Sequence, residues 1–433
     1  MLQKYKNYIK PKSYTNILIK FLFNTPKIPH FCTELLIPYF MRLHRPVLNN
    51  IISALNKIIN ENFYTDKVLE YIFKTNKQLG KRDRQLIAET TYNIVRYYYY
   101  YQYLSKSTDL RKIIHTYFIK NNIPIDNLSI SKISIDEKKE IPDRIKYSYN
   151  ESLWEEGIQQ LGKEKWIKEA SALNESAALV IRTNTLKISR DELQKKLLNI
   201  GIETKKVDDV PEALIITNKS YLSQNDLFKA GYYEFQDVSS QKVAHFIPKE
   251  ILPSAKRIID ACAGAGGKTL HLSALMQNKG QIIAMDVEEK KLRELKKRSA
   301  RAGCSNIQIK LINSSKTIKR LSHSADVVLI DAPCSGTGVI KRNPDTKLKF
   351  NKENYSELIA IQQQILNDYS TMVKDNAYLL YVTCSILPEE NEHQVRKFLN
   401  QHSEFSLVKE QTLYPSDGFD GFYMALLQKK KQS

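Results

Sequence analysis

Two cysteines stand where the sequence favours covalent chemistry. Cys334 follows the tripeptide Asp-Ala-Pro, Cys384 follows a threonine, and each comes just after an apolar run that predicts a buried strand, residues 326–331 and 378–383. In an open α/β sheet the carboxyl ends of the strands form the ligand crevice. A single cysteine is usually a small core residue. Two cysteines at this edge, facing one pocket if the strands are neighbours, indicate a functional pair.

The chemistry open to such a pair is nucleophilic addition to a pyrimidine. A thiolate that adds to carbon 6 of cytosine makes carbon 5 nucleophilic enough to attack an electrophilic methyl group. Asp331 is placed to hydrogen-bond to ring N3 or N4 and so stabilise the adduct. A second thiol suits removal of the carbon 5 proton, directly or through water. From the residues alone either thiol could be the nucleophile, and the target base must be unstacked to reach the pocket.

A glycine-rich turn at residues 260–269, DACAGAGGKT, follows another predicted strand and precedes a helix. It fits neither of two common phosphate motifs: Cys262 stands where a P-loop needs its first glycine, and Thr269 stands where a dinucleotide fingerprint needs its third. Asp286 ends the next strand, 22 residues after Gly264, and a carboxylate there can bind two ribose hydroxyls. These features favour a nucleoside ligand without a pyrophosphate, such as S-adenosylmethionine.

The elements around these residues alternate between strand and helix over residues 251–433. This alternation predicts an α/β, Rossmann-like domain with a parallel sheet covered on both faces. The predicted strands are 257–261, 281–287, 307–312, 326–331 and 378–383, and the predicted helices are 288–301, 355–373 and 389–401.

Three further segments precede this domain. Residues 1–40 form a basic extension, possibly not native, with Met41 as an alternative start. Apolar residues recur at helical spacing over residues 41–150, which predicts an all-α domain whose third helix runs from Arg82 into the tyrosine run 97–101. Residues 151–250 predict a small α+β segment, with strands at 178–186, 213–217 and 232–235 and a helix at 189–198 that begins with the capping box Ser189/Glu192.

Composition sets the class of protein. The chain of 433 residues has 66 Lys and Arg against 47 Asp and Glu, a net charge of +19 that favours a polyanionic partner, although AT-rich coding also enriches Lys, Asn, Ile and Tyr. Its five cysteines are an odd number without C-x-x-C spacing, which argues against disulfides and a zinc site and for the cytoplasm. No apolar run is long enough for a membrane span, and we expect a monomer.

Taken together, the motifs resemble the Sun/RsmB branch of the RNA cytosine-5 methyltransferases, which act on ribosomal RNA. The resemblance covers roughly residues 175–427, and the pairing of DAPCSGTG with TCS is its most specific part. More weakly, residues 41–150 resemble an RNA-binding domain of the NusB type, and residues 151–250 an RRM-like segment. The matching stretches are RTNTLKIS (182–189), FQDVSSQ (235–241), DACAGAGGKT (260–269), DAPCSGTGVIKRNPD (331–345), YVTCSILPEENE (381–392) and DGFDGFYMALL (417–427).

The resemblance implies a role for each matching residue. Cys384 would be the nucleophile, Cys334 would assist release of the product, and Asp331 would lie beside the base and the methyl group. S-adenosylmethionine would be the cofactor and RNA, most of all small-subunit ribosomal RNA, the partner; transfer RNA, a non-catalytic RNA-binding role and a P-loop nucleotide hydrolase are the alternatives. The cofactor would be bound by Cys262, Ala263, Gly264, Ala265, Gly266, Gly267, Lys268, Asp286, Asn313 and Asp331.

The chain departs from the family pattern in three places, one of which is Lys374-Asp-Asn-Ala377, where the family has Lys-Pro-Gly-Gly before the fifth predicted strand. Gly264 and Ala265 replace the usual Ala-Pro of the turn, and Asn313 replaces an aspartate that contacts adenine; its amide oxygen can still accept a hydrogen bond from the adenine amino group. Candidate RNA contacts are Arg182, Asn184, Lys187 and Arg342.

Overall fold

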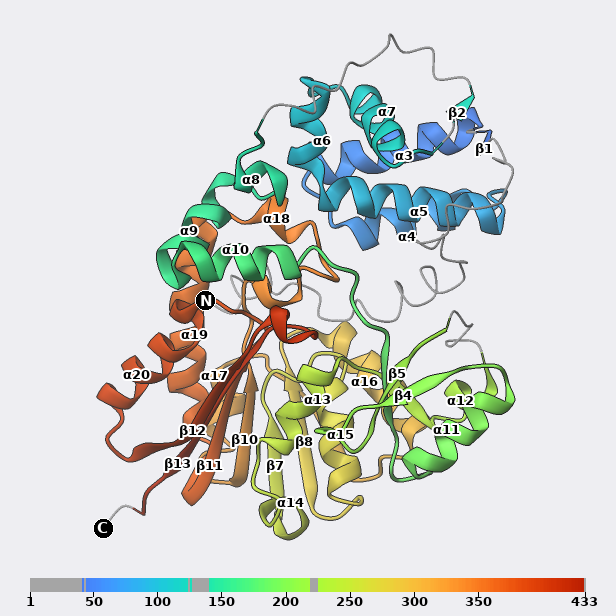
Figure 1. Ribbon diagram of the computed structural model, residues 1–433. Helices are drawn as coiled ribbons and strands as arrows, with labels where there is room; N and C mark the ends of the chain where they lie inside the picture. The colour runs from blue at the N-terminus through green and yellow to red at the C-terminus, as the bar shows by residue number, and fades with distance from the viewer. Residues whose placement is uncertain (1–40, 43, 124, 127–139, 219–224, 432–433) are drawn as a thin grey trace.

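The computed structural model describes residues 41–42, 44–123, 125–126, 140–218 and 225–431. Figure 1 shows a helical domain, a small four-stranded sheet beside the catalytic domain, and a larger sheet with helices on both faces. The prediction made for residues 1–40 lies outside the described residues. No helix in the described part of the chain is long and apolar enough to cross a membrane.

The helical domain packs around one apolar core. Its residues at helical spacing face inward: Ile51, Leu55 and Ile58 are at most 1% exposed. The predicted helix through the tyrosine run is instead two helices, because the backbone leaves helical geometry at Tyr97 (φ −119°, ψ 31°). Tyrosines of this run, among them Tyr98, pack in the core. The helices are α3 (Arg45–Ile59), α4 (Thr65–Thr75), α5 (Lys81–Arg96), α6 (Tyr98–Ser105) and α7 (Leu110–Lys120), and the short strands β1 (Met41–Arg42) and β2 (Ile125–Asp126) pair beside them.

A second helical segment joins this domain to the rest of the chain. It consists of α8 (Asp143–Lys146), α9 (Glu151–Leu161) and α10 (Lys163–Ala172). Trp154 and Trp166 of this segment share an apolar cluster with Tyr355 and Leu387 of the catalytic domain. The apolar faces of these helices are buried against the catalytic domain, and the predicted domain boundary at residue 151 stays a prediction.

The small sheet is antiparallel, with the order β4-β5-β3-β6. The predicted helix is present and begins as expected, with the Ser189 side chain accepting a hydrogen bond from the backbone of Glu192. Its apolar face closes a core in which Leu193, Leu197 and Leu214 are fully buried. The elements are β3 (Val180–Thr183), α11 (Arg190–Asn199), β4 (Thr204–Lys206), β5 (Ala213–Ile216), α12 (Asp226–Lys229) and β6 (Tyr233–Phe235).

The large sheet has seven strands in the order β12-β13-β11-β10-β7-β8-β9. Its five predicted strands are all present and parallel: β7 (Arg257–Asp260), β8 (Gln281–Asp286), β9 (Ile307–Leu311), β10 (Ala325–Asp331) and β11 (Val373–Thr383). The prediction of a wholly parallel sheet is wrong, because β12 (Phe405–Leu413) and β13 (Phe422–Lys429) form an antiparallel hairpin at one edge. The middle of β12 is exposed, so the apolar pattern that marks a buried strand is missing there.

Helices cover both faces of this sheet, as predicted. One face packs against α13 (Val238–His245), α14 (Ile251–Ser254), α15 (Gly267–Leu275) and α16 (Glu289–Ala302). The other packs against α17 (Ser315–Lys319), α19 (Lys352–Ser370) and α20 (Glu392–Gln401), while α18 (Thr346–Lys349) lies beside α9 and α10 in Figure 1. The chain order reverses between β7 and β10, and such a switch point opens a crevice at the carboxyl ends of the strands.

Candidate active site

The two cysteines of the predicted pair meet at this edge. Strands β10 and β11 are parallel neighbours, so the loops that follow them lie side by side. Cys334 Sγ lies 3.1 Å from Cys384 Sγ, and the backbone N–H of Cys384 donates to Cys334 Sγ at 3.3 Å. Cys334 is buried, whereas Cys384 is half-buried. The structure thus brings together two thiols that are 50 residues apart in the chain.

A buried hydrogen-bond network holds the two cysteine loops, and the sequence analysis assigned no role to the residues that form it. Glu390, the last residue of η2 (Pro388–Glu390), is fully buried and accepts from the backbone N–H of Ser335 at 2.6 Å. Its neighbour Asn391 donates to the backbone carbonyl of Ser385 at 3.1 Å. Gln362 of α19 donates both to Glu390 and to the carbonyl of Pro333, at 2.9 Å each. Two adjacent residues therefore fix the residue that follows each cysteine.

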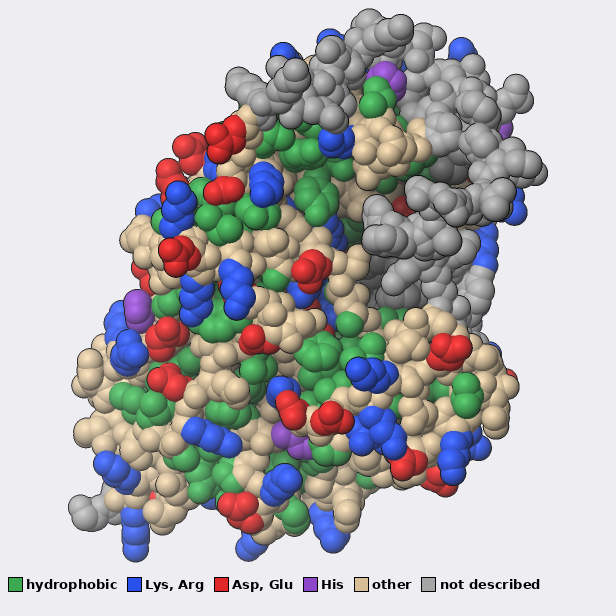
Figure 2. Space-filling view, in the orientation of Figure 1, with side chains coloured by type: hydrophobic (Ala, Val, Ile, Leu, Met, Phe, Trp, Pro, Cys, Tyr) green, Lys and Arg blue, Asp and Glu red, His purple; other side chains and the backbone are tan. Residues whose placement is uncertain are grey.

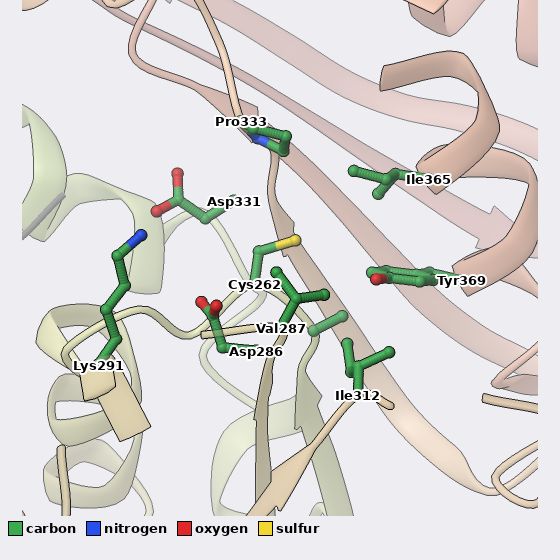
Figure 3. A pocket seen from close by; sticks show the side chains of 10 residues that line it. Cys262, Asp286, Val287, Lys291, Ile312, Asp331, Pro333, Ile365 and Tyr369 are labelled. Carbon is green, nitrogen blue, oxygen red and sulfur yellow. The ribbon is translucent and has the colours of Figure 1, made fainter. Parts of the chain in front are cut away.

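A pocket of about 400 Å³ opens beside this pair at the switch point. Figure 3 shows the carboxylates of Asp286 and Asp331 and the ammonium group of Lys291 on one side of it, and Ile365 and Tyr369 on the other. Neither paired sulfur lines the pocket, but Pro333, the residue before Cys334, does. Its lining is completed by Ala261, Cys262, Val287 and Ile312. The mainly apolar lining with a few charged groups is typical of a small-molecule site.

The glycine-rich turn is tied to the pocket by its backbone. The N–H of Gly264 donates to Asp286 Oδ2 at 2.8 Å, and the N–H of Glu288 donates to Asp286 Oδ1 at 2.8 Å. Gly266 has φ +89°, and a Cβ there would lie 2.6 Å from Leu295 Cγ, so only glycine fits. Ala265, one of the two turn residues that depart from the family pattern, is also held in place, since Arg298 donates to its backbone carbonyl at 2.8 Å.

The predicted cofactor residues are not all equally placed. Asp286 is 7% exposed and lines the pocket together with Cys262. Asn313 directly follows Ile312, a lining residue, but is itself exposed and does not line the pocket. Lys291 lies in the pocket and was missed, because a lysine in a helix rich in Lys and Arg carries no distinctive sequence signal. The remaining predicted residues, Ala263, Gly264, Ala265, Gly266, Gly267 and Lys268, form the turn between β7 and α15.

Two buried carboxyl groups next to the turn differ in their partners. Lys268 Nζ lies 2.9 Å from Asp331 Oδ2, and the two side chains are 10% and 11% exposed, respectively. This ion pair stabilises the ionised form of Asp331. Asp260 is fully buried, accepts a hydrogen bond from Thr269 Oγ1 at 2.7 Å, and has its pKa raised to about 7 by burial and, to a lesser degree, by the charge of Asp331.

The four candidate RNA contacts bind other parts of the protein instead. Arg182 is 3% exposed and donates to the carbonyl of Gly267 at 2.7 Å. Asn184 is 5% exposed and donates to the carbonyls of Gly231 and Ala302, both at 2.8 Å. The prediction of RNA contact is therefore wrong for these two side chains, because burial leaves neither in reach of a phosphate.

The other two candidates, Lys187 and Arg342, also bind protein groups, and they lie where the small sheet meets the catalytic domain. Lys187 is exposed, but its ammonium group donates to the carbonyls of Ala230 and Arg301 at 2.7 Å. Arg342 forms ion pairs with Asp237 at 2.8 Å and with Asp420 at 2.7 Å. We call the boundary between the small sheet and the catalytic domain, where these four residues lie, the seam. On the face shown in Figure 2, Lys and Arg are interspersed with Asp and Glu rather than gathered in one patch.

The large sheet, its switch-point pocket and the carboxylate at the end of β8 define a Rossmann-like methyltransferase domain. Family models agree: residues 251–428 match the one described as 16S rRNA methyltransferase RsmB/F, and residues 149–222 match the ferredoxin-like domain of RsmF/B-like methyltransferases. The probable ribosomal RNA small subunit methyltransferase B of Synechocystis sp. is 30% identical over 321 residues, which cover 70% of each chain. The chain belongs to the RsmB/F family.

Methyltransferases of this family use S-adenosylmethionine, as predicted for this chain. The ribosomal RNA small subunit methyltransferase B of Pasteurella multocida is 36% identical over 280 residues, 61% of this chain and 62% of that one, so the match spans less than two thirds of its length. Membership of the family sets aside the P-loop alternative.

A solved structure extends the likeness in fold to most of the chain. The crystal structure of PH0851 has a TM-score of 0.72 and 24% sequence identity, and covers 92% of this chain and 100% of its own. Neither family model reaches the helical domain, which lies before residue 149, so its NusB-like character stays a prediction, as does the RRM-like character of the small sheet.

Proposed function

We propose that the protein transfers the methyl group of S-adenosylmethionine to carbon 5 of a cytosine in small-subunit ribosomal RNA. The observation that carries this proposal is the thiol pair, Cys334 and Cys384, 3.1 Å apart beside a pocket with two carboxylates. A non-catalytic RNA-binding protein has no need of two adjacent thiols at the strand ends of its sheet.

The residues of the pocket fit S-adenosylmethionine. Val287 and Ile312 offer apolar surface for the adenine ring, and Asp286 lies between them and the turn as an acceptor for the ribose hydroxyls. Lys268 and Lys291 are the cations nearest the pocket carboxylates and suit the amino-acid end. Bound there, the cofactor supplies an electrophilic methyl group.

Cys384 is the better candidate for the nucleophile because it is the more accessible thiol. Its thiolate adds to carbon 6 of the cytosine, a carbon–sulfur bond forms, and carbon 5 gains the electron density to take the methyl group. Cys334 then accepts the proton of carbon 5, and the carbon–sulfur bond breaks as the double bond re-forms. The N–H of Cys384 points at Cys334 Sγ at 3.3 Å and holds the two sulfurs next to each other for this step.

Asp331 orients the base in this scheme. Its ion pair with Lys268 favours the carboxylate, which accepts a hydrogen bond from the exocyclic amino group at N4. A carboxylate held in this form is an acceptor first, so we place orientation of the cytosine ahead of protonation of N3 as its role.

The test is methyl transfer to defined RNA in vitro. The full chain is incubated with methyl-labelled cofactor and either small-subunit ribosomal RNA or transfer RNA, each from cells that lack the gene, and the digested nucleosides are separated. We expect label in 5-methylcytidine from the ribosomal RNA. Label from transfer RNA alone would change the substrate, whereas RNA binding without any transfer would favour the non-catalytic alternative and overturn the proposal.

The covalent step has its own test, the variant Cys334→Ala. Without a proton acceptor the methylated adduct cannot eliminate, so the protein stays bonded to its RNA. We expect a slow-migrating protein–RNA band on denaturing gels that appears with cofactor and disappears after ribonuclease treatment. The double variant Cys334→Ala/Cys384→Ala is the matched control and should give no band; a band that persists in it would exclude Cys384 as the bonded residue.

A further inference from the structure

Three side chains gather away from the thiol pair and have no part in the proposed reaction. Glu212 immediately precedes β5 in the small-sheet domain, His245 ends α13, and His271 lies within α15. Glu212 Oε2 is 2.8 Å from His245 Nε2 and 3.6 Å from His271 Nε2. One ligand atom from each of the three lies within 4.8 Å of the other two.

His271 is the unusual member of this cluster. It is 1% exposed, and neither of its ring nitrogens has a hydrogen-bond partner among the described residues. Buried imidazole nitrogens are normally hydrogen-bonded, so an unpartnered one calls for a ligand. A neutral imidazole is the form that binds a metal ion.

We propose that Glu212, His245 and His271 bind one divalent transition-metal ion, with zinc the best match. Two imidazoles and one carboxylate are a donor set that zinc takes. Bonds of about 2.0–2.1 Å in tetrahedral geometry place ligand atoms about 3.3 Å apart. The observed 2.8 Å and 3.6 Å lie on either side of this spacing, and the third pair, between the two histidines, lies within 4.8 Å, so the side chains must close inward around the ion.

The exposure and the charge of this cluster are both compatible with a bound metal ion. The His245 side chain is 21% exposed, which leaves a route for the ion and a place for water as the fourth ligand. The Glu212 side chain is 6% exposed, so water screens its carboxylate little from a bound cation. The charge of Arg182, which acts on His271, is attracted by the carboxylates of both Glu234 and Glu212.

A metal ion here would join two domains. Glu212 belongs to the small-sheet domain, whereas His271 lies one helical turn into α15, which begins at Gly267 in the glycine-rich turn. The ion would therefore fix the helix that follows the cofactor turn, a structural role independent of the proposed methyl transfer. The sequence analysis argued against a zinc site from the cysteines, and ligands spread from 212 to 271 without regular spacing form no motif that predicts one.

The test is the metal content of the full chain after equilibration with zinc and removal of the unbound ion. We expect about one zinc per chain, a thermal midpoint raised by roughly 5 °C, and, with cobalt(II) in place of zinc, a visible spectrum without thiolate charge-transfer bands. The double variant Cys334→Ser/Cys384→Ser should keep the ion, which separates this site from zinc bound by the catalytic thiols.

The variants His245→Gln and Glu212→Gln should lose the ion and the thermal shift. His402→Gln is the matched control, because His402 pairs with Glu404 at 3.1 Å outside the cluster, and it should retain both. Absence of stoichiometric metal in the unmodified chain overturns the proposal, as does a zinc equivalent retained in folded His245→Gln. Because His245 is partly exposed, its variant should fold even if a His271 variant does not.

Discussion

The seam and the carboxyl edge of the large sheet both bury charged side chains, but they use them differently. At the seam, charges are matched by opposite charges: Arg342 lies between Asp237 and Asp420, and Glu234 pairs with Arg298 and Arg301. At the edge, Asp286 accepts backbone N–H groups, and the carboxylate faces a pocket. In this comparison the seam charges hold the fold, whereas the charges at the edge border a pocket, and the following predictions separate the two uses.

The largest expected effect lies at the edge. Cys384→Ala should lower the rate of methyl transfer by about 10⁴-fold or more, because it removes the nucleophile of the proposed covalent step. The affinity for S-adenosylmethionine, measured by calorimetry, and the thermal midpoint should stay unchanged. Cys304→Ala, which alters a half-buried free cysteine elsewhere, is the control and should keep activity. A turnover in Cys384→Ala close to that of the unmodified chain would contradict the nucleophile assignment.

Substitutions at the seam should lower the free energy of unfolding rather than the rate of methyl transfer. Arg342→Ala leaves the carboxylates of Asp237 and Asp420 buried without their cation, which costs about 3 kcal/mol or more. Denaturant unfolding should show this loss. Arg293→Ala should show almost none, because its pair with Glu289 is 72% and 59% exposed. Equal effects of the two substitutions would mean that the seam pairs are not structural.

The cofactor pocket should give an intermediate effect. Asp286→Ala removes the acceptor for the ribose hydroxyls and the anchor of Gly264, so the affinity for S-adenosylmethionine should fall by roughly 10- to 100-fold. Asp286→Asn keeps one acceptor oxygen and should lose less. Calorimetry with each variant measures this order, and an unchanged affinity in Asp286→Ala would remove Asp286 from the cofactor site.

The smallest expected effect concerns pH. The pKa of Asp260 is raised to about 7 in the folded protein, above the value of the unfolded chain, so the folded state holds the extra proton and loses stability as pH rises through 7. The loss between pH 6 and 8 should be on the order of 1 kcal/mol. Asp260→Asn cannot ionise, yet it can still accept the hydrogen bond from Thr269. The free energy of unfolding of this variant should change less between pH 6 and 8. A pH dependence equal to that of the unmodified chain would contradict the assignment.

The sequence predicted local elements well, but not the contacts between residues that are far apart in the chain. The five parallel strands were predictable because each is a short apolar run bounded by turn residues. The hairpin of β12 and β13 was not, because its pairing depends on β11, far from it in the chain, and one strand is exposed in its middle. Likewise Arg182 and Asn184 read as RNA contacts from their types, although their partners, Gly267 and Ala302, were not visible in the sequence.

By itself the sequence determined which reactive residues stand at the ends of the predicted strands: two cysteines and three aspartates, together with a glycine-rich turn and a family pattern. These features were readable because strand periodicity and motif spacing are local properties. Only the tertiary structure decided that the sulfurs lie 3.1 Å apart, that Glu390 and Asn391 hold their loops, and that the candidate arginines bind protein instead of RNA. The physical reason is that distance, burial and pairing arise between residues brought together from separate elements, and no local pattern encodes them.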